Sequence, residues 1–300
     1  MAVETQSDYE TTLSDVAARV RATDRTGAES TTPDARADET LERMRRGAAA
    51  IAFPIPAEPA LPIDPATGHP PVELFYDSIA DEFDDVMNKY DLERRLHTVF
   101  DVFFKGIDLR GRRLLDAGCG TGWFSQAACL RGANVTALDI GPRLLARVHE
   151  KCDATTVIGD VLNLDYPDDT FDVVISSECI EHTRYPQRAV RELIRVCRPG
   201  GLIAITSNNR TWYWLCAMAN RFDWRPYKGI ENWPTWRDFH SWFATENVQI
   251  VDRRGIHLFP FQIRVLHPLL RRLDRYGRTL GRFCVNQGIL AIKQAAAPST

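Results

Sequence analysis

The sequence predicts an α/β domain in which helices cover both faces of a mostly parallel, seven-stranded sheet. Seven apolar runs of strand length alternate with helix-like segments between residues 112 and 294, and this alternation is typical of parallel sheets. A glycine-rich turn follows the first run, and aspartates stand at the ends of the first three. Open sheets of this kind bind ligands at the carboxyl ends of their strands, so we expect a ligand site at that edge.

The elements are expected in a simple order. One or two helices occupy 73–104, where apolar residues recur every three to four positions. These residues are Phe75, Ile79, Phe83, Val86 and Tyr90. The strands follow as RRLLDAG (112–118), NVTALDI (134–140), TTVIGD (155–160), FDVVISS (171–177), GLIAITS (201–207), VQIVDRR (248–254) and GILAIKQ (288–294).

The ends of the chain differ in composition from this domain. Residues 1–53 contain few large apolar side chains and are expected to form a tail without stable structure, apart from a short helix within 37–53. Residues 54–71 hold too many prolines for a helix or a β-ladder, so we expect an extended linker. The domain is therefore expected to span 72–294, with helical insertions at 210–247 and 257–284 and a short tail at 295–300.

Composition indicates a globular protein of the cytoplasm. The chain is 44% hydrophobic and 26% charged, and its formal net charge of −3 makes nucleic acid an improbable partner overall. Its seven cysteines form no C-x-x-C pair, which indicates a reducing compartment. Neither a secretory signal nor a run of about 20 apolar residues is present.

The segment LLDAGCGTGWF (114–124) is the most informative part of the sequence. Three alternate glycines follow Asp116 and precede a helix, so the backbone can bend sharply and approach a ligand. A plain strand-to-helix turn is the simpler interpretation of a lone G-x-G. A dinucleotide fingerprint is not met, because Trp123 stands where the third glycine should be.

Two further acids extend this pattern. Asp139 ends the second strand, where a carboxylate can accept hydrogen bonds from both hydroxyls of a ribose. Asp160 follows the third strand and could accept from an exocyclic amine. Each acid alone could be a helix cap or a turn residue, but their joint spacing favours a nucleoside ligand.

Together these motifs resemble the class I S-adenosylmethionine-dependent methyltransferases over roughly residues 72–294. The matching pieces are D-x-G-x-G-x-G, the second acid, the G-D pair, FDVVISSECIEH and RVCRPGGLIAIT. The resemblance implies a Rossmann-like fold, an enzyme, and S-adenosylmethionine as cofactor. It assigns cofactor binding to Asp116, Gly118, Cys119, Gly120, Gly122, Asp139, Ile140, Asp160, Val161 and Ser177.

The stretch ECIEH (178–182) ends the fourth apolar run and supplies candidate catalytic groups. Glu178, Glu181 and His182 share one face if a helical turn begins at the first of them. They could then bind Mg²⁺ or another divalent metal. Alternatively His182 could act alone as a general base, or the acids could only cap a helix.

ECIEH, NRT (209–211), YKGIENW (227–233) and VNQGILAIK (285–293) also resemble the O-methyltransferases of ubiquinone biosynthesis. The E-x-x-E-H element is similar to that of the small-RNA 2′-O-methyltransferases as well, and both groups associate it with a divalent metal. The resemblance thus implies Glu178, Glu181 and His182 as catalytic residues and as metal ligands. The quinone enzymes read G-T-H-D near GIEN, so Glu231 replaces a histidine here.

The two insertions have unusual compositions. Six tryptophans between 212 and 242 could form a lid over an aromatic or prenylated acceptor, or could simply pack a helical subdomain. Six arginines and one acid, Asp274, lie between 259 and 283 together with leucines at 269, 270 and 273. That segment could contact anionic lipid, phosphate or RNA, or could be a solvated helix docked on the domain.

The sequence therefore predicts O-methylation of a hydroxyl group on a small aromatic, quinone-like or specialised metabolite. Three alternatives remain: C- or N-methylation of a small molecule, 2′-O-methylation of RNA, and a cofactor-binding scaffold subunit without activity. We expect a cytoplasmic protein that contacts the membrane periphery, if at all, through 259–283. The sequence does not predict the acceptor or the oligomeric state.

Overall fold

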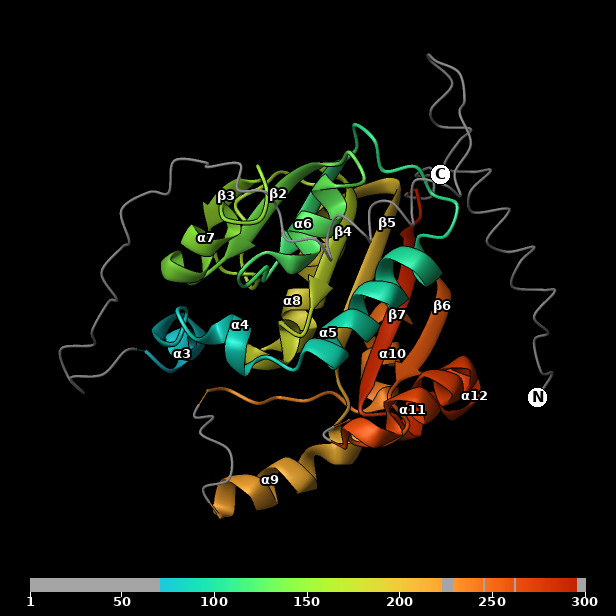
Figure 1. Cartoon of the computed structure of the whole chain (residues 1–300). Coiled ribbons are helices and arrows are strands. Elements are labelled where there is room, and N and C mark those ends of the chain that lie inside the picture. The colour runs from blue at the N-terminus through green and yellow to red at the C-terminus, as the bar shows by residue number, and fades with distance from the viewer. Residues whose placement is uncertain (1–70, 223–228, 245, 262, 296–300) are drawn as a thin grey trace.

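A seven-stranded sheet runs through the computed structural model in the order β3-β2-β1-β4-β5-β7-β6 (Figure 1). All neighbouring strands from β3 to β5 are parallel, and β7 is antiparallel to both β5 and β6. The strands are β1 (Arg113–Ala117), β2 (Asn134–Asp139), β3 (Thr155–Ile158), β4 (Phe171–Ser177), β5 (Cys197–Asn208), β6 (Val248–Ile256) and β7 (Asn286–Lys293). Each of the seven predicted runs overlaps one strand, so the predicted fold class is confirmed.

The structure describes residues 71–222, 229–244, 246–261 and 263–295. The predictions for the tail at 1–53, for nearly all of the linker at 54–71 and for 296–300 lie outside the described residues. No helix in the described ranges is long and apolar enough to span a membrane.

The helices of the sheet core lie on both of its faces. They are α6 (Trp123–Cys129), α7 (Pro142–Val148), α8 (Pro186–Val196) and α10 (Trp236–Ala244). Neighbouring strand residues alternate between two buried clusters: Leu114 packs with α6 and α7 residues, and Leu115 packs with α8 and α10 residues. A fully buried aliphatic side chain contributes roughly 1.5–3 kcal/mol, so burial on both faces fixes the register of the strands.

The chain before β1 forms more helices than the one or two expected. They are α3 (Phe75–Ser78), α4 (Phe83–Val86), α5 (Lys89–Leu96) and a π-helix at His97–Phe103. Asn88 interrupts the run, because its side chain accepts a hydrogen bond from Asp91 N (3.1 Å) and starts α5 as a new helix. Val86 is consequently exposed rather than part of a continuous apolar stripe.

The two insertions also consist of short elements. The first contains α9 (Tyr213–Arg221) and α10, and the second contains α11 (His267–Leu273) and α12 (Gly277–Leu280) joined by 3₁₀ turns. The leucines at 269, 270 and 273 do not form one buried stripe. Leu270 is buried, whereas Leu269 is half exposed.

Candidate functional site

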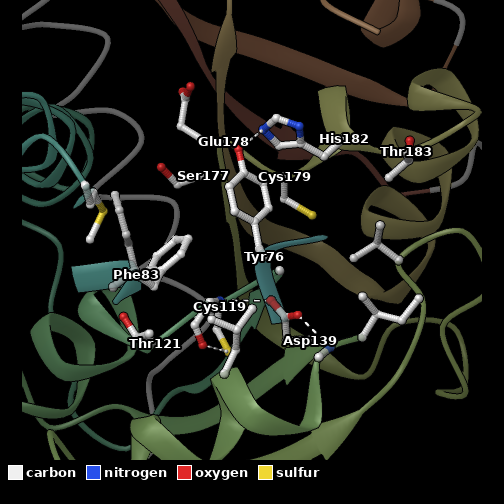
Figure 2. A pocket seen from close by; sticks show the side chains of 18 of the residues that line it. Tyr76, Phe83, Cys119, Thr121, Asp139, Ser177, Glu178, Cys179, His182 and Thr183 are labelled. Atoms are coloured by element: carbon white, nitrogen blue, oxygen red, sulfur yellow. Dashed lines mark hydrogen bonds between the residues drawn. The ribbon is translucent and has the colours of Figure 1, made fainter. Parts of the chain in front are cut away.

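The site forms where the strand order reverses. β1 lies between β2 and β4. The loops that follow β1 and β4 therefore emerge next to each other, with a crevice between them at the carboxyl edge of the sheet. The glycine turn follows β1 and ECIEH follows β4. Between them lies a cavity of about 620 Å³, whose third wall comes from the helices before β1 (Figure 2).

The glycine turn packs directly against ECIEH. Gly118 has φ 72°, and a Cβ built on it would lie 2.1 Å from Cys179 Sγ, so no other residue fits there. Gly122 has φ 88° and precedes α6, but it does not line the cavity. Of the ten residues expected to bind the cofactor, all except Gly122 line this cavity.

Asp139 is held by backbone donors on both carboxylate oxygens. Its Oδ2 accepts from Gly120 N and its Oδ1 from Gly141 N, both at 2.9 Å. Burial raises the pKa of Asp139, and these backbone hydrogen bonds oppose the rise. Each oxygen keeps a second lone pair, so the carboxylate can still accept hydroxyl groups of a ligand.

The other two predicted acids lie at either side of Asp139. Asp116 is buried and accepts from Ser125 Oγ at 2.6 Å; burial raises its pKa to about 7. Asp160 is exposed at the cavity rim, and its Oδ1 accepts from Leu162 N at 2.8 Å. The first acid is therefore partly protonated near neutral pH, and the second stays in contact with solvent.

ECIEH does not form the helical turn that the spacing suggested. Its 3₁₀ turn spans Ile180–His182, and Glu178 before it has φ 53°, a left-handed conformation that is strained for this residue type. The three polar side chains of ECIEH therefore do not share a face. In Figure 2 the Glu178 carboxyl group extends away from the His182 ring.

The carboxyl group of Glu178 is buried in the cavity wall. Its Oε1 has no hydrogen-bond partner among the described residues. Burial, followed by the nearby Glu181 charge, raises the pKa of Glu178 well above its usual range, and Arg95 opposes the rise. The buried, unpartnered Oε1 of Glu178 therefore remains available to a polar group in the cavity.

Glu181 points behind the cavity instead of into it. Its side chain is fully buried, and Oε1 accepts from Asn208 N (2.9 Å) and Asn208 Nδ2 (3.0 Å) at the end of β5. It does not line the cavity. This position ties the turn to the sheet and does not fit the catalytic and metal-binding roles expected for Glu181.

His182 faces the cavity with one nitrogen. Its Nδ1 lies 2.9 Å from the carbonyl oxygen of Ile230, and because a carbonyl only accepts, Nδ1 carries the proton. In the neutral imidazole Nε2 is then an acceptor, and it lies 3.3 Å from the Tyr76 hydroxyl. Figure 2 shows Tyr76 between His182 and the glycine turn with Asp139.

A divalent metal does not fit this arrangement. Glu181 accepts from Asn208 through Oε1 and does not line the cavity, and the Glu178 carboxyl group extends away from the His182 ring. In the ranges that the structure describes, no group of three or more His, Cys, Asp or Glu side chains could hold a metal ion. The segment around Glu231 does contact ECIEH, but through backbone groups: Asn232 N donates to the Glu181 carbonyl at 2.7 Å.

Sequence reasoning missed the contribution of the helices before β1. Asp84 accepts from Thr121 Oγ1 (2.5 Å) and Trp123 Nε1 (2.9 Å), so α4 holds the glycine turn. Asp77 Oδ1 accepts the backbone N–H groups of Arg143 (2.7 Å) and Leu144 (3.0 Å) at the start of α7. Helical spacing identified the apolar residues there, but no motif marked Tyr76 or these acids.

A buried ion-pair network borders the far end of the cavity. Arg95 donates through Nε to Asp91 Oδ2 (2.8 Å) and through Nη1 to Ser177 Oγ (3.0 Å). The other carboxylate oxygen of Asp91 lies 3.0 Å from His257 Nε2. Ser177, expected to bind the cofactor, is therefore tied to this network as well as lining the cavity.

The aromatic insertion contributes less to the cavity than expected. Trp233 is 4% exposed and lines it together with Cys216 of α9. Trp214 is 57% exposed, Trp236 lies under Arg253, and Trp224 is outside the described residues. Among the tryptophans of this insertion that the structure describes, Trp233 is the one that lines the cavity.

Comparisons with known proteins agree with this geometry. Residues 115–205 match a family model described as a methyltransferase domain. A ubiquinone biosynthesis O-methyltransferase of Pseudomonas putida is 34% identical over 111 residues, which cover 35% of this chain and 47% of that protein. A malonyl-acyl-carrier-protein O-methyltransferase of Pectobacterium atrosepticum is 41% identical over 98 residues, covering 32% and 39%. The chain thus spans about half the length, or less, of these curated relatives.

Solved structures share the fold. A methyltransferase in complex with the Trm112 methyltransferase activator of Haloferax volcanii is 17% identical with a TM-score of 0.55, covering 74% of this chain and 98% of that chain. A SAM-dependent methyltransferase of Thermotoga maritima is 16% identical with a TM-score of 0.53, covering 73% and 98%. Residues 115–205 thus match a methyltransferase domain, and the solved structures show that this chain shares their fold.

Proposed function

We propose that this protein is an S-adenosylmethionine-dependent methyltransferase that methylates a hydroxyl group on a small, largely apolar aromatic or quinone-like acceptor. One observation carries the proposal. A single cavity joins the glycine turn and Asp139, which suit a nucleoside, to a histidine with an acceptor nitrogen facing inward. The matched methyltransferase domain at 115–205 contains both the turn and the histidine.

The described residues fit the cofactor. Asp139 would hold the ribose hydroxyls with its remaining lone pairs, Asp160 and the Val161 backbone would border the adenine, and the glycine turn would border the amino-acid portion. The cofactor supplies a methyl group already activated on a sulfonium. The chain itself then has to hold the acceptor oxygen in line with the bond between methyl and sulfur, and to reduce the proton affinity of that oxygen.

The apolar side chains among the cavity residues support an apolar acceptor. They include Met87, Leu92, Trp233, Phe261 and Val285. Apolar and aromatic side chains of this kind enclose a ring and exclude water. The O-methyltransferase names of the curated relatives favour oxygen as the methylated atom.

His182 suits the role of general base. Its Nδ1 proton is donated to the Ile230 carbonyl, so the orientation of the ring is fixed. Nε2 can then remove the proton from the hydroxyl group that is to be methylated. The Tyr76 hydroxyl now lies 3.3 Å from Nε2, a long hydrogen bond that an acceptor hydroxyl could replace. Glu178 lies in the same wall, and its unpartnered Oε1 would pair with a second polar group of the acceptor.

Calorimetry with S-adenosylmethionine tests the proposal. We expect the wild type to bind with one site per chain, and Asp139→Ala to weaken binding at least about 30-fold, because hydrogen bonds to a charged acceptor are lost. Asp108→Ala, an exposed carboxylate outside the cavity, is the matched control and should bind normally. Absence of binding by the folded wild type, or normal binding by Asp139→Ala, would refute the proposal.

A further inference from the structure

We propose that His257 is a positioning residue for ligand binding, which holds Asp91 and through it sets the direction of the Arg95 guanidinium in the cavity wall. His257 follows β6 directly and begins the second insertion. Its Nε2 lies 3.0 Å from Asp91 Oδ1, and Arg95 Nε donates to Asp91 Oδ2 at 2.8 Å. The inference rests on the proposed function, in which S-adenosylmethionine occupies the cavity.

His257 carries two unfavourable features that packing alone does not explain. Its φ of 59° lies in the left-handed region, which is uncommon for residues other than glycine and costs free energy. Its Nδ1 is buried and has no hydrogen-bond partner among the described residues, and such an atom lowers stability. An apolar side chain would avoid this second cost. We therefore attribute the histidine to the bond that its Nε2 makes.

The surroundings of His257 fix the direction of its ring. The side chain is fully buried, and its ring contacts those of Tyr90 and Phe261, with centroids 5.3 Å and 4.7 Å away. The main chain is bound on both sides. The backbone N–H of His257 donates to Asp274 Oδ1 at 2.9 Å, and its carbonyl accepts from Val285 N at 2.8 Å. Nε2 is therefore held at a defined point.

Asp91 is the link between His257 and the cavity. Both of its carboxylate oxygens are engaged, and because a carboxylate only accepts, Nε2 of His257 is the donor to Oδ1. Burial alone would raise the pKa of Asp91, but the Arg95 charge and the His257 hydrogen bond outweigh burial and lower it. Asp91 therefore stays ionised and cannot turn without breaking a charge-assisted hydrogen bond.

Arg95 carries the effect into the cavity. Its side chain is buried and lines the cavity together with Asp91 and Ser177. Nε is bound to Asp91 and Nη1 donates to Ser177 Oγ at 3.0 Å, whereas Nη2 makes no hydrogen bond in the part of the chain that the structure describes. A guanidinium is planar and rigid, so fixing two of its nitrogens also fixes the third. Nη2 is thus left as a directed donor for an anionic group of a ligand.

The carboxylate of the amino-acid portion is the anionic group that S-adenosylmethionine offers. Ser177, which Arg95 holds, is one of the predicted cofactor-binding residues and lines the same cavity. Hydrogen bonds from a guanidinium to a carboxylate are among the stronger polar contacts, and they depend on orientation. His257 itself does not line the cavity. It therefore contributes to cofactor affinity without touching the cofactor.

Calorimetry with two cofactors separates positioning from folding. S-adenosylmethionine and decarboxylated S-adenosylmethionine share the nucleoside and the sulfonium, and differ in the carboxylate. We expect the wild type to prefer the first at least about tenfold, because one charge-assisted hydrogen bond is added. His257→Leu should remove most of this preference, and should change binding of the decarboxylated form by less than about threefold.

His257→Gln tests whether the N–H donor is what matters. Glutamine and leucine share the left-handed backbone penalty at this position, but glutamine keeps an N–H group that can reach Asp91. We expect His257→Gln to restore the preference for S-adenosylmethionine to within about threefold of the wild type.

His267→Leu is the matched control. The His267 ring stacks on Tyr90 in the same insertion, with centroids 3.7 Å apart, but its Nε2 lies 2.9 Å from the Phe261 carbonyl. The preference between the two cofactors should stay as in the wild type. If His257→Leu does not fold in a thermal melt, Asp91→Asn takes its place, because its amide keeps only one of the two acceptor oxygens. The same selective loss is then expected.

The outcomes that overturn the proposal are specific. The positioning role fails if the wild type binds both cofactors equally, or if His257→Leu weakens both equally or neither. It also fails if His257→Gln loses as much as His257→Leu. In each of these cases S-adenosylmethionine still binds the wild type, so the proposed function stands. A folded wild type that binds neither cofactor would overturn both.

Discussion

The two nitrogens of His182 have different roles in the proposed chemistry. Nδ1 is engaged by the Ile230 carbonyl, which belongs to the segment that precedes α10. Nε2 points to Tyr76 from the helices before β1. The base is thus oriented by a part of the chain 48 residues away and covered by another 106 residues away, which explains why ECIEH alone could not define its function.

Substitution of His182 should show whether the acceptor loses its proton to the histidine itself or through a bound metal ion. We expect His182→Ala to lower kcat on a catechol-type acceptor by about 10²–10⁴-fold, the usual contribution of general-base catalysis. Tyr76→Phe keeps the ring but loses one hydrogen bond, so its effect should stay within about tenfold. Turnover should persist in a chelator, because the described residues do not fit a metal.

Two results would contradict this account. Loss of turnover in chelator, restored by Mg²⁺, would return the metal to the mechanism. An equal loss of kcat in Tyr76→Phe and His182→Ala would mean that the proton passes through the Tyr76 hydroxyl.

Asp116 should make stability depend on pH. Burial raises its folded pKa to about 7 from an ordinary value of 3.8, so between these values the folded state holds a proton that the unfolded chain has released. Stability therefore falls as pH rises through this window, by about 4 kcal/mol at most. Asp116→Asn stays neutral and can still accept from Ser125 Oγ, so it should be more stable than the wild type at pH 8.

Urea unfolding without cofactor, from pH 4 to pH 8, measures this difference. The advantage of Asp116→Asn should shrink toward pH 4, where both side chains are neutral. Asp108→Asn is the comparison, because Arg110 lowers the pKa of Asp108 and its carboxylate is exposed. If the free energy of unfolding depended on pH in the same way for the wild type and Asp116→Asn, burial would not disfavour the charged form of Asp116.

At the scale of elements, the sequence predicted strands better than helices. Burial of Leu114 and Leu115 on opposite faces requires a continuous apolar run, and such runs are visible in sequence. The carboxyl-edge location of the glycine turn, Asp139 and His182 follows from the strand order alone. Most of the residues that line the cavity near the sheet could therefore be predicted from the sequence.

The positions of the helices before β1 could not be predicted from the sequence in this way. Their position depends on single polar contacts, such as Asp77 with the start of α7 and Asp84 with Thr121, and such contacts leave no periodic signal. The side-chain directions of ECIEH were also missed, because Glu178 adopts a left-handed conformation instead of beginning a helix. A spacing of three and four residues predicts a shared face only within a regular helix.

At the scale of the whole molecule, residues 72–96 connect the two sides of the cavity. Asp77 contacts α7 beside β2 and β3, whereas Asp91 contacts His257 and Arg94 contacts Asp274 beside β6. The segment is thus anchored on both sides of the ligand site and borders it along its length. A ligand that fills the cavity should therefore stabilise this segment against local opening.

Hydrogen exchange with and without S-adenosylmethionine measures that effect. We expect slower exchange in 72–87 as well as in the glycine turn at 116–122, because α3 and α4 touch both the cavity and the turn through Asp84. Peptides of α8, which packs on one face of the sheet, should be unchanged, as should 264–273 of the second insertion. Protection of the glycine turn without protection of 72–87 would mean that the helices before β1 do not close over the cofactor. In that case Tyr76 would not control access to His182, and the acceptor could reach the base without displacing a hydroxyl.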